Sequence, residues 1–111
     1  TALFPGITAY PTPGHTPGHS CYVVTSKGES IEFWGDLVHF ASVQLPKPEI
    51  TVAYDVDANA AAAQRKKQFA RAEASRILVA CAHLPFPGVG HLRMADEGYA
   101  WVPVDYRWRE P

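Results

Sequence analysis

The sequence predicts an α/β protein, for three reasons. Short runs rich in β-branched and aromatic residues, each ended by turn residues, are typical of strands. A long alanine-rich stretch in the middle of the chain is typical of a helix. A continuous apolar run follows it, as in a strand buried on both faces. The order of strand, strand, helix, strand and hairpin fits one half of a layered α/β sandwich.

The first third of the chain contains the strand patterns. Residues 7–11 form a short β-prone run, and residues 20–34 form a predicted hairpin with turn residues at its centre. Residues 37–43 could hold a short helical turn. Pro46 and Pro48 then predict an extended, irregular connection, because proline restricts both its own backbone and that of the preceding residue.

A helix is expected from Ala58 onward, with Asp57 as its N-cap. Alanine and straight-chain polar residues, which are strong helix formers, fill the stretch that follows. Apolar residues at helical spacing predict a narrow buried stripe: Ala62, Phe69 and Ala72, with Ala63, Ala70 and Ala74. The basic residues at 65–67 are interpreted as a solvated helix face.

The last third of the chain begins with the apolar run 76–82, a predicted buried strand that ends at His83. Residues 84–90 contain too much proline and glycine to be regular, and residues 92–94 and 99–104 form a predicted closing hairpin. Two tryptophans are interpreted as packing residues: Trp101 and Trp108.

Length and composition limit the function classes. The chain has 111 residues, enough for at most one domain, and its 47% hydrophobic content is enough for a core. A net charge of −1 gives no electrostatic reason to expect nucleic acid or an anionic membrane as a partner. No apolar run approaches the roughly 20 residues of a membrane span.

Cysteine usage and the first residues bear on compartment and completeness. Cys21 and Cys81 lie in separate predicted strands without CxxC spacing, so we expect two buried free thiols and a cytoplasmic location. The chain starts at Thr1 without an initiator Met or the layout of a signal peptide. We therefore expect a fragment or a processed product.

The most informative motif is Thr12-Pro13-Gly14-His15-Thr16-Pro17-Gly18-His19, in which each histidine follows a Pro-Gly pair. Such a loop is rigid and aims an imidazole at a fixed point. Asp36 and His83 also follow predicted strands, where α/β proteins place their sites. Two imidazoles and a carboxylate suit Zn, Fe or Mn, and the two oxygens of Asp36 could bridge two cations.

The motifs around His15, Asp36 and His83 resemble those of a known protein superfamily. The Pro-Gly-His loop, then Trp34-Gly35-Asp36-Leu37-Val38-His39, then the string from His83 to His91, resemble the second half of the metallo-β-lactamase superfamily, especially its lactonase-like and methyl-parathion-hydrolase-like hydrolases. The resemblance implies that His15 binds one metal, that Asp36 bridges both metals, and that His83 binds the second. It assigns His19 a structural or second-shell role.

One departure from the family pattern is large. The superfamily also uses an HxHxDH motif upstream of the Pro-Gly-His loop, and this sequence has no such motif among its five histidines. The resemblance therefore implies that residues 1–111 are the C-terminal portion of such a domain. They would form half of an αββα sandwich, a mixed sheet with one long helix.

The implied activity is metal-dependent hydrolysis, in which two metal ions activate water against a small ester, lactone or phosphoester. Zinc is the expected metal, two ions in the complete protein, with Mn or Fe as alternatives. Residues flanking the ligands could form an apolar substrate wall: Phe40, Leu84, Phe86 and Pro87. His39 and His91 are candidates for second-shell donors or pocket groups.

Alternatives remain open. One is a non-catalytic truncated scaffold that binds metal weakly or not at all, and another is a non-haem iron redox protein related to the flavodiiron proteins. The isolated chain is expected to be inactive and to hold metal sub-stoichiometrically or not at all. Half a sandwich would also expose an apolar face, so we expect self-association through it.

Overall fold

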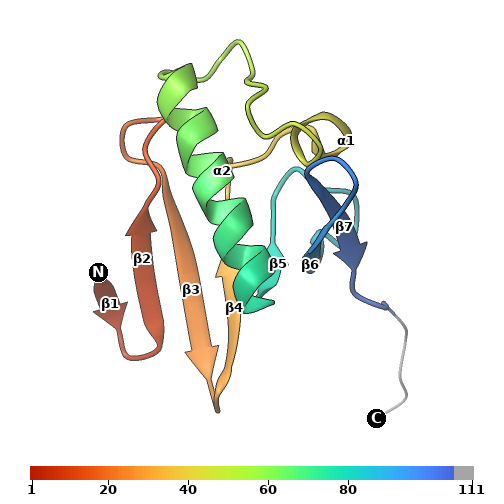
Figure 1. Ribbon diagram of the computed structural model, residues 1–111. Helices are drawn as coiled ribbons and strands as arrows, with labels where there is room; N and C mark the ends of the chain where they lie inside the picture. The colour runs from red at the N-terminus through yellow and green to blue at the C-terminus, as the bar shows by residue number, and fades with distance from the viewer. Residues whose placement is uncertain (107–111) are drawn as a thin grey trace.

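The polypeptide forms a seven-stranded mixed sheet with one long helix on one face, in a computed structural model that describes residues 1–106 (Figure 1). The strands follow the sequence order across the sheet, and neighbours are antiparallel except for the parallel pair β4 and β5. The strands are β1 Ala2–Phe4, β2 Ile7–Pro11, β3 Ser20–Ser26, β4 Glu29–Phe33, β5 Leu78–Ala80, β6 Val89–Met94 and β7 Tyr99–Pro103. The helices are α1 Ala41–Gln44 and α2 Ala58–Ser75.

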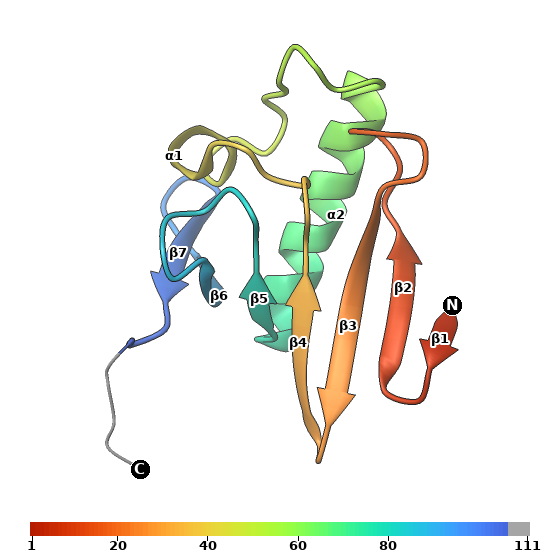
Figure 2. The ribbon, with the colours of Figure 1, turned by 180° about the vertical axis from the view of Figure 1, so that it is seen from behind.

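Helix α2 connects β4 to β5 and covers one face of the sheet, as the view from behind shows with the strands in front (Figure 2). Asp57 is its N-cap, as the sequence predicts, and accepts a hydrogen bond from the backbone N–H of Ala60 at 3.0 Å. Phe69 on α2 stacks on Trp34 with ring centroids 5.3 Å apart. These rings lie in the core between helix and sheet.

The buried face of α2 differs from the predicted stripe. Phe69 and Ala72 are buried, but three alanines of the stripe are exposed: Ala63, Ala70 and Ala74. Lys66 and Lys67 are exposed as expected, whereas Arg65 is only 1% exposed. The interpretation of a fully solvated basic face is therefore wrong at Arg65, because the chain between β4 and α2 packs over this side chain.

Other expectations differ in detail. Strand β5 has three residues, shorter than the run 76–82, because Arg76 ends α2 in a left-handed conformation. The helical turn expected within 37–43 is present as α1, which begins at Ala41 and ends at Gln44, just beyond that range. Strand β1, which pairs with β2, was not predicted. Trp101 packs against the core, and Trp108 lies outside the described residues.

The sheet face opposite α2 carries exposed aromatic residues. Tyr22 and Phe33 are paired across β3 and β4 and are 41% and 42% exposed. Their neighbours Cys21 and Glu32 point to the other face and are fully buried. This face has no helix over it in Figures 1 and 2.

Both cysteines are free and buried, as expected. Burial raises the pKa of Cys21 to about 12 and also raises the pKa of Cys81, so neither thiol is a reactive nucleophile. Within residues 1–106, no helix has both the length and the apolar character needed to cross a membrane.

Candidate metal centre

The Pro-Gly-His loop is fixed against the start of α2. A Cβ atom on Gly14 would lie 2.2 Å from the backbone nitrogen of Ala61, and the φ of Gly14 is 153°. The carbonyl of Gly14 accepts from the N–H of Asp57 at 2.8 Å, and that of His15 accepts from Val56 at 3.0 Å. Only glycine allows this contact, which holds His15 beside the chain that precedes the helix.

Asp36 lies between two imidazoles. Its Oδ2 is 3.3 Å from Nε2 of His15, and its Oδ1 is 2.6 Å from Nε2 of His83. His15 comes from the β2–β3 loop, Asp36 follows β4 and His83 follows β5, so the three reach one edge of the sheet. The structure thus brings the three predicted ligands together, with one carboxylate oxygen facing each histidine.

His19 holds the backbone of Asp36 through a hydrogen bond. Its Nε2 accepts the backbone N–H of Asp36 at 3.0 Å, so its Nδ1 carries the proton and donates to Oγ1 of Thr12 at 2.7 Å. Burial, as the largest influence, lowers the pKa of His19. The ring therefore connects the Pro-Gly-His loop to the chain that follows β4.

His39 lies within the cluster. Its ring centroid is 4.7 Å from that of His15 and 4.8 Å from that of His83. The side chain is buried, and its Nδ1 has no hydrogen-bond partner. Burial, followed by the nearby His15 and His83, lowers its pKa, which favours a neutral ring. Tyr54 stands edge-on to the same ring at 5.2 Å.

The remaining predicted pocket residues are distributed differently. Phe40 and Phe86 are 57% and 79% exposed, on the loops that follow β4 and β5. Leu84 is not part of an exposed wall, because its side chain is buried in the core. His91 lies on β6 beside Arg76 and Glu29, at the end of the sheet away from Asp36, and does not reach the cluster.

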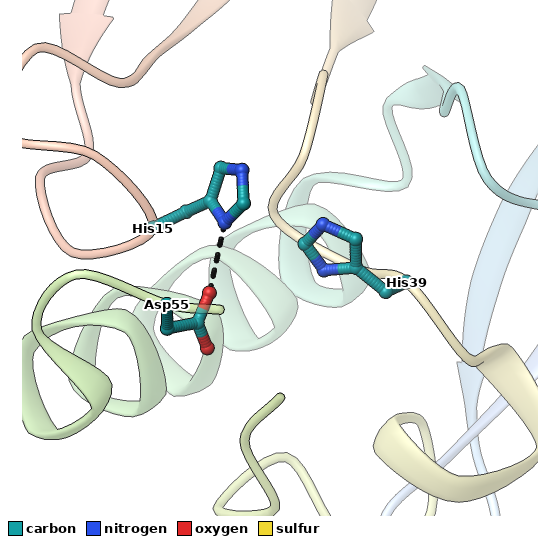
Figure 3. Close-up of side chains that lie close together, drawn as sticks. All are labelled: His15, His39 and Asp55. Carbon is teal, nitrogen blue, oxygen red and sulfur yellow. Dashed lines mark hydrogen bonds and ion pairs between the residues drawn. The ribbon is translucent and has the colours of Figure 1, made fainter. Parts of the chain in front are cut away.

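Asp55 is a member of the cluster that sequence reasoning missed. Its Oδ1 lies 2.9 Å from Nδ1 of His15, and its side chain is 0% exposed (Figure 3). In the sequence, Asp55 is an acidic residue shortly before the N-cap Asp57, and acidic residues are common in loops. Nothing in the sequence pairs Asp55 with a residue 40 positions earlier.

The electrostatics of Asp36 keep it ionised. Burial alone would raise the pKa of this carboxyl group, but the hydrogen bond from His83 and the charges of His15 and His83 oppose this and lower it. An ionised carboxylate between imidazoles is the state that a metal ligand needs.

The donor set consists of imidazole nitrogens and carboxylate oxygens, which are ligands that zinc accepts. Nitrogen and oxygen ligands about 2.0–2.1 Å from a tetrahedral zinc lie about 3.3 Å apart, and the His15–Asp36 contact is 3.3 Å. The His83–Asp36 contact of 2.6 Å is shorter and is a direct hydrogen bond. Donor atoms fall into two groups: His15, His39 and Asp55, and Asp36, His39 and His83.

His39 belongs to both donor groups. Its ring is stacked on that of His83 with 24° between their planes, and its Nδ1 has no hydrogen-bond partner.

The fold and the cluster together define the class. The chain has part of a metallo-β-lactamase fold, and the resemblance drawn from its motifs is confirmed by structural matches over nearly its whole length. It is a homologue of metal-dependent hydrolases and lactonases of that superfamily. No protein-family model matches the chain, and no curated protein matches it.

The solved structures that it resembles include two of high similarity. The hydrolase AbOPH of the beta lactamase superfamily is 44% identical over 94% of this chain, with a TM-score of 0.88. AidC, a dizinc quorum-quenching lactonase in complex with a homoserine product, is 28% identical over 96% of this chain, with a TM-score of 0.90. This chain spans 36% of the length of each.

A more distant likeness supports the fold alone. A probable metal-dependent hydrolase from Staphylococcus aureus is 17% identical over 97% of this chain, with a TM-score of 0.72. This chain spans 39% of that protein.

Proposed function

We propose that this chain supplies three ligands, His15, Asp36 and His83, to the dinuclear metal centre of a hydrolase. The observation that carries the proposal is the placement of Asp36, each of whose oxygens faces Nε2 of a different histidine. Such a carboxylate can bridge two ions, with one histidine available to each. Zinc is the proposed metal, since the donors are imidazole and carboxylate and AidC is a dizinc enzyme.

The reaction proposed is hydrolysis of a small lactone, ester or phosphoester. Bound metals would supply Lewis acidity and a water acidified to near-neutral pKa. His15, Asp36 and His83 would hold the ions, and His19 would hold the backbone of Asp36 through its 3.0 Å hydrogen bond. Three ligands are too few for two zinc sites of about four ligands each, so further ligands have to come from elsewhere in the active protein.

The binding of metal can be tested on this chain with matched histidine variants. Zinc titration followed by calorimetry should give weak binding, and His83→Gln should weaken it about tenfold or more, since a lost ligand costs at least as much as a lost second-shell partner. His91→Gln is the control, because His91 is also exposed but lies at the other end of the sheet. Equal effects of the two substitutions would contradict the ligand assignment.

Activity is tested in a polypeptide that also carries an HxHxDH segment. There Asp36→Asn should lower kcat/KM for lactone and phosphotriester substrates by a factor of about 100 or more, because both ions lose a shared ligand. Metal analysis of the same protein separates the alternatives. Bound iron with redox activity and no hydrolysis would favour a redox protein related to the flavodiiron proteins. Absence of tight metal binding would favour a non-catalytic scaffold.

A further inference from the structure

We propose that Asp55 is a positioning residue that keeps the proton of His15 on Nδ1, so that Nε2 presents its lone pair toward Asp36. The inference rests on the proposed function, because it assigns Nε2 of His15 to the metal. It assigns a role to a buried carboxylate that no sequence motif indicates.

The contact between Asp55 and His15 indicates which ring nitrogen carries the proton. A carboxylate oxygen accepts hydrogen bonds, so we assign the 2.9 Å contact between Oδ1 of Asp55 and Nδ1 of His15 to an N–H on Nδ1 that donates to it. On a neutral ring, Nε2 then carries the lone pair, and it lies 3.3 Å from Oδ2 of Asp36. Both of these atoms are acceptors, so a cation suits the space between them.

Asp55 is itself held in place by its neighbours. Its side chain is fully buried, its Oδ2 accepts the backbone N–H of Val52 at 3.3 Å, and Nη2 of Arg65 lies 3.9 Å from the same oxygen. Arg65 is buried as well, and its guanidinium also donates to the carbonyls of Leu37, Pro48 and Ile50. These contacts hold the carboxylate of Asp55 in one orientation. Its hydrogen bond with Nδ1 then fixes the orientation of the His15 ring.

The geometry separates this role from direct metal binding. Asp55, His39 and His15 form a possible donor group, and Asp55 contacts Nδ1 of His15. A metal on Nδ1 would displace the proton that the Asp55 contact requires and would break that 2.9 Å hydrogen bond. Figure 3 shows the Asp55 carboxylate directed at the imidazole of His15. A histidine ligand whose second nitrogen donates to a carboxylate is a common arrangement around zinc.

The experiment measures the ring nitrogens directly. Long-range ¹H–¹⁵N correlation spectra of the metal-free chain, recorded where the rings are neutral, assign the tautomer of each histidine. We expect His15 with its proton on Nδ1. In Asp55→Asn, whose amide can donate as well as accept, the Nε2-protonated form should appear. Asp96→Asn, at an exposed position in the β6–β7 turn, is the control and should leave His15 unchanged.

Zinc affinity provides the second measurement. Asp55→Asn should weaken zinc binding about 10–100-fold, while Asp96→Asn should leave it unchanged within about twofold. A wild-type His15 protonated on Nε2 would overturn the inference, and so would an Asp55→Asn variant with wild-type tautomer and affinity. If the wild-type chain shows the Nδ1 tautomer but the polypeptide that also carries an HxHxDH segment binds no zinc, the inference about Asp55 stands and the proposed function fails. The wild-type spectrum decides the tautomer even if Asp55→Asn does not fold.

Discussion

At the scale of single residues, the three predicted ligands come together because each lies shortly after a strand or in a glycine-fixed loop. His15, Asp36 and His83 could be named from the sequence, since their spacing relative to strand patterns is local information. Asp55 and His39 could not be assigned in the same way. Their places depend on how the chain between β4 and α2 folds back over the sheet.

Glu32 illustrates a residue whose chemistry follows from burial alone. It is fully buried on the helix side of β4, its Oε2 has no hydrogen-bond partner, and its Oε1 lies 3.4 Å from Nη1 of Arg71. Burial raises the pKa of this carboxyl, although Arg71 and the indole of Trp34 oppose the change. The folded state therefore favours the protonated form of Glu32 more than the unfolded chain does.

The raised pKa of Glu32 makes the stability of the protein depend on pH. The raised pKa means that this group costs no stability below its unfolded pKa, and that its cost grows as the pH rises toward the folded pKa. Because burial disfavours the charged form of Glu32, Glu32→Gln should raise the free energy of unfolding by about 1 kcal/mol near neutral pH, and by less near about pH 4.5. Urea denaturation at the two pH values measures this.

The control for this prediction is Glu29→Gln, at an exposed position on the same strand. It should change the unfolding free energy little at either pH. A Glu32→Gln variant that is less stable than the wild type at neutral pH would contradict the assigned cost of burying Glu32.

At the scale of elements, α2 and the chain before it form one unit through Arg65. The alanine-rich composition and the cap at Asp57 predict the helix from its own residues. The burial of Arg65 needs three carbonyls between residues 37 and 50 to surround its guanidinium. The neighbouring Lys66 and Lys67 carry the same charge but are exposed. The charge of a side chain in this stretch therefore does not indicate whether it is buried.

Arg65→Met tests this unit. It removes the hydrogen bonds to Leu37, Pro48 and Ile50 and leaves the carboxylate of Asp55 buried without its cation, so we expect a loss of about 3 kcal/mol in unfolding free energy. Thermal and urea denaturation measure the loss. Lys67→Met, on the exposed face, should change stability by less than about 0.5 kcal/mol. Similar effects at both positions would contradict the role of Arg65.

At the scale of the whole molecule, the sheet is covered by α2 on one face only. The other face carries an open apolar hollow of about 400 Å³ that includes Tyr22, Phe33 and Val89 in its lining. An exposed apolar surface of this kind favours association, since contact removes it from water. The chain spans 36% of the solved hydrolase and lactonase that it resembles.

We predict that the chain self-associates through this face. Sedimentation velocity should give a weight-average mass that rises with concentration, and Phe33→Ser should reduce the rise because it removes an aromatic ring from the centre of the face. Met94→Ser is the control, since Met94 is 59% exposed but is not part of the hollow. A wild-type chain that stays monomeric at all concentrations would contradict the prediction.

The sequence by itself determined the strands of the two hairpins, the start of α2 and three candidate ligands, because propensities, caps and turn residues act over a few neighbouring positions. The tertiary structure decided which polar groups meet: it brought Asp55 and His39 to His15, buried Arg65 and placed His91 at the opposite end of the sheet. These outcomes depend on contacts between distant segments, such as the one that joins residues 40 positions apart in the His15–Asp55 pair.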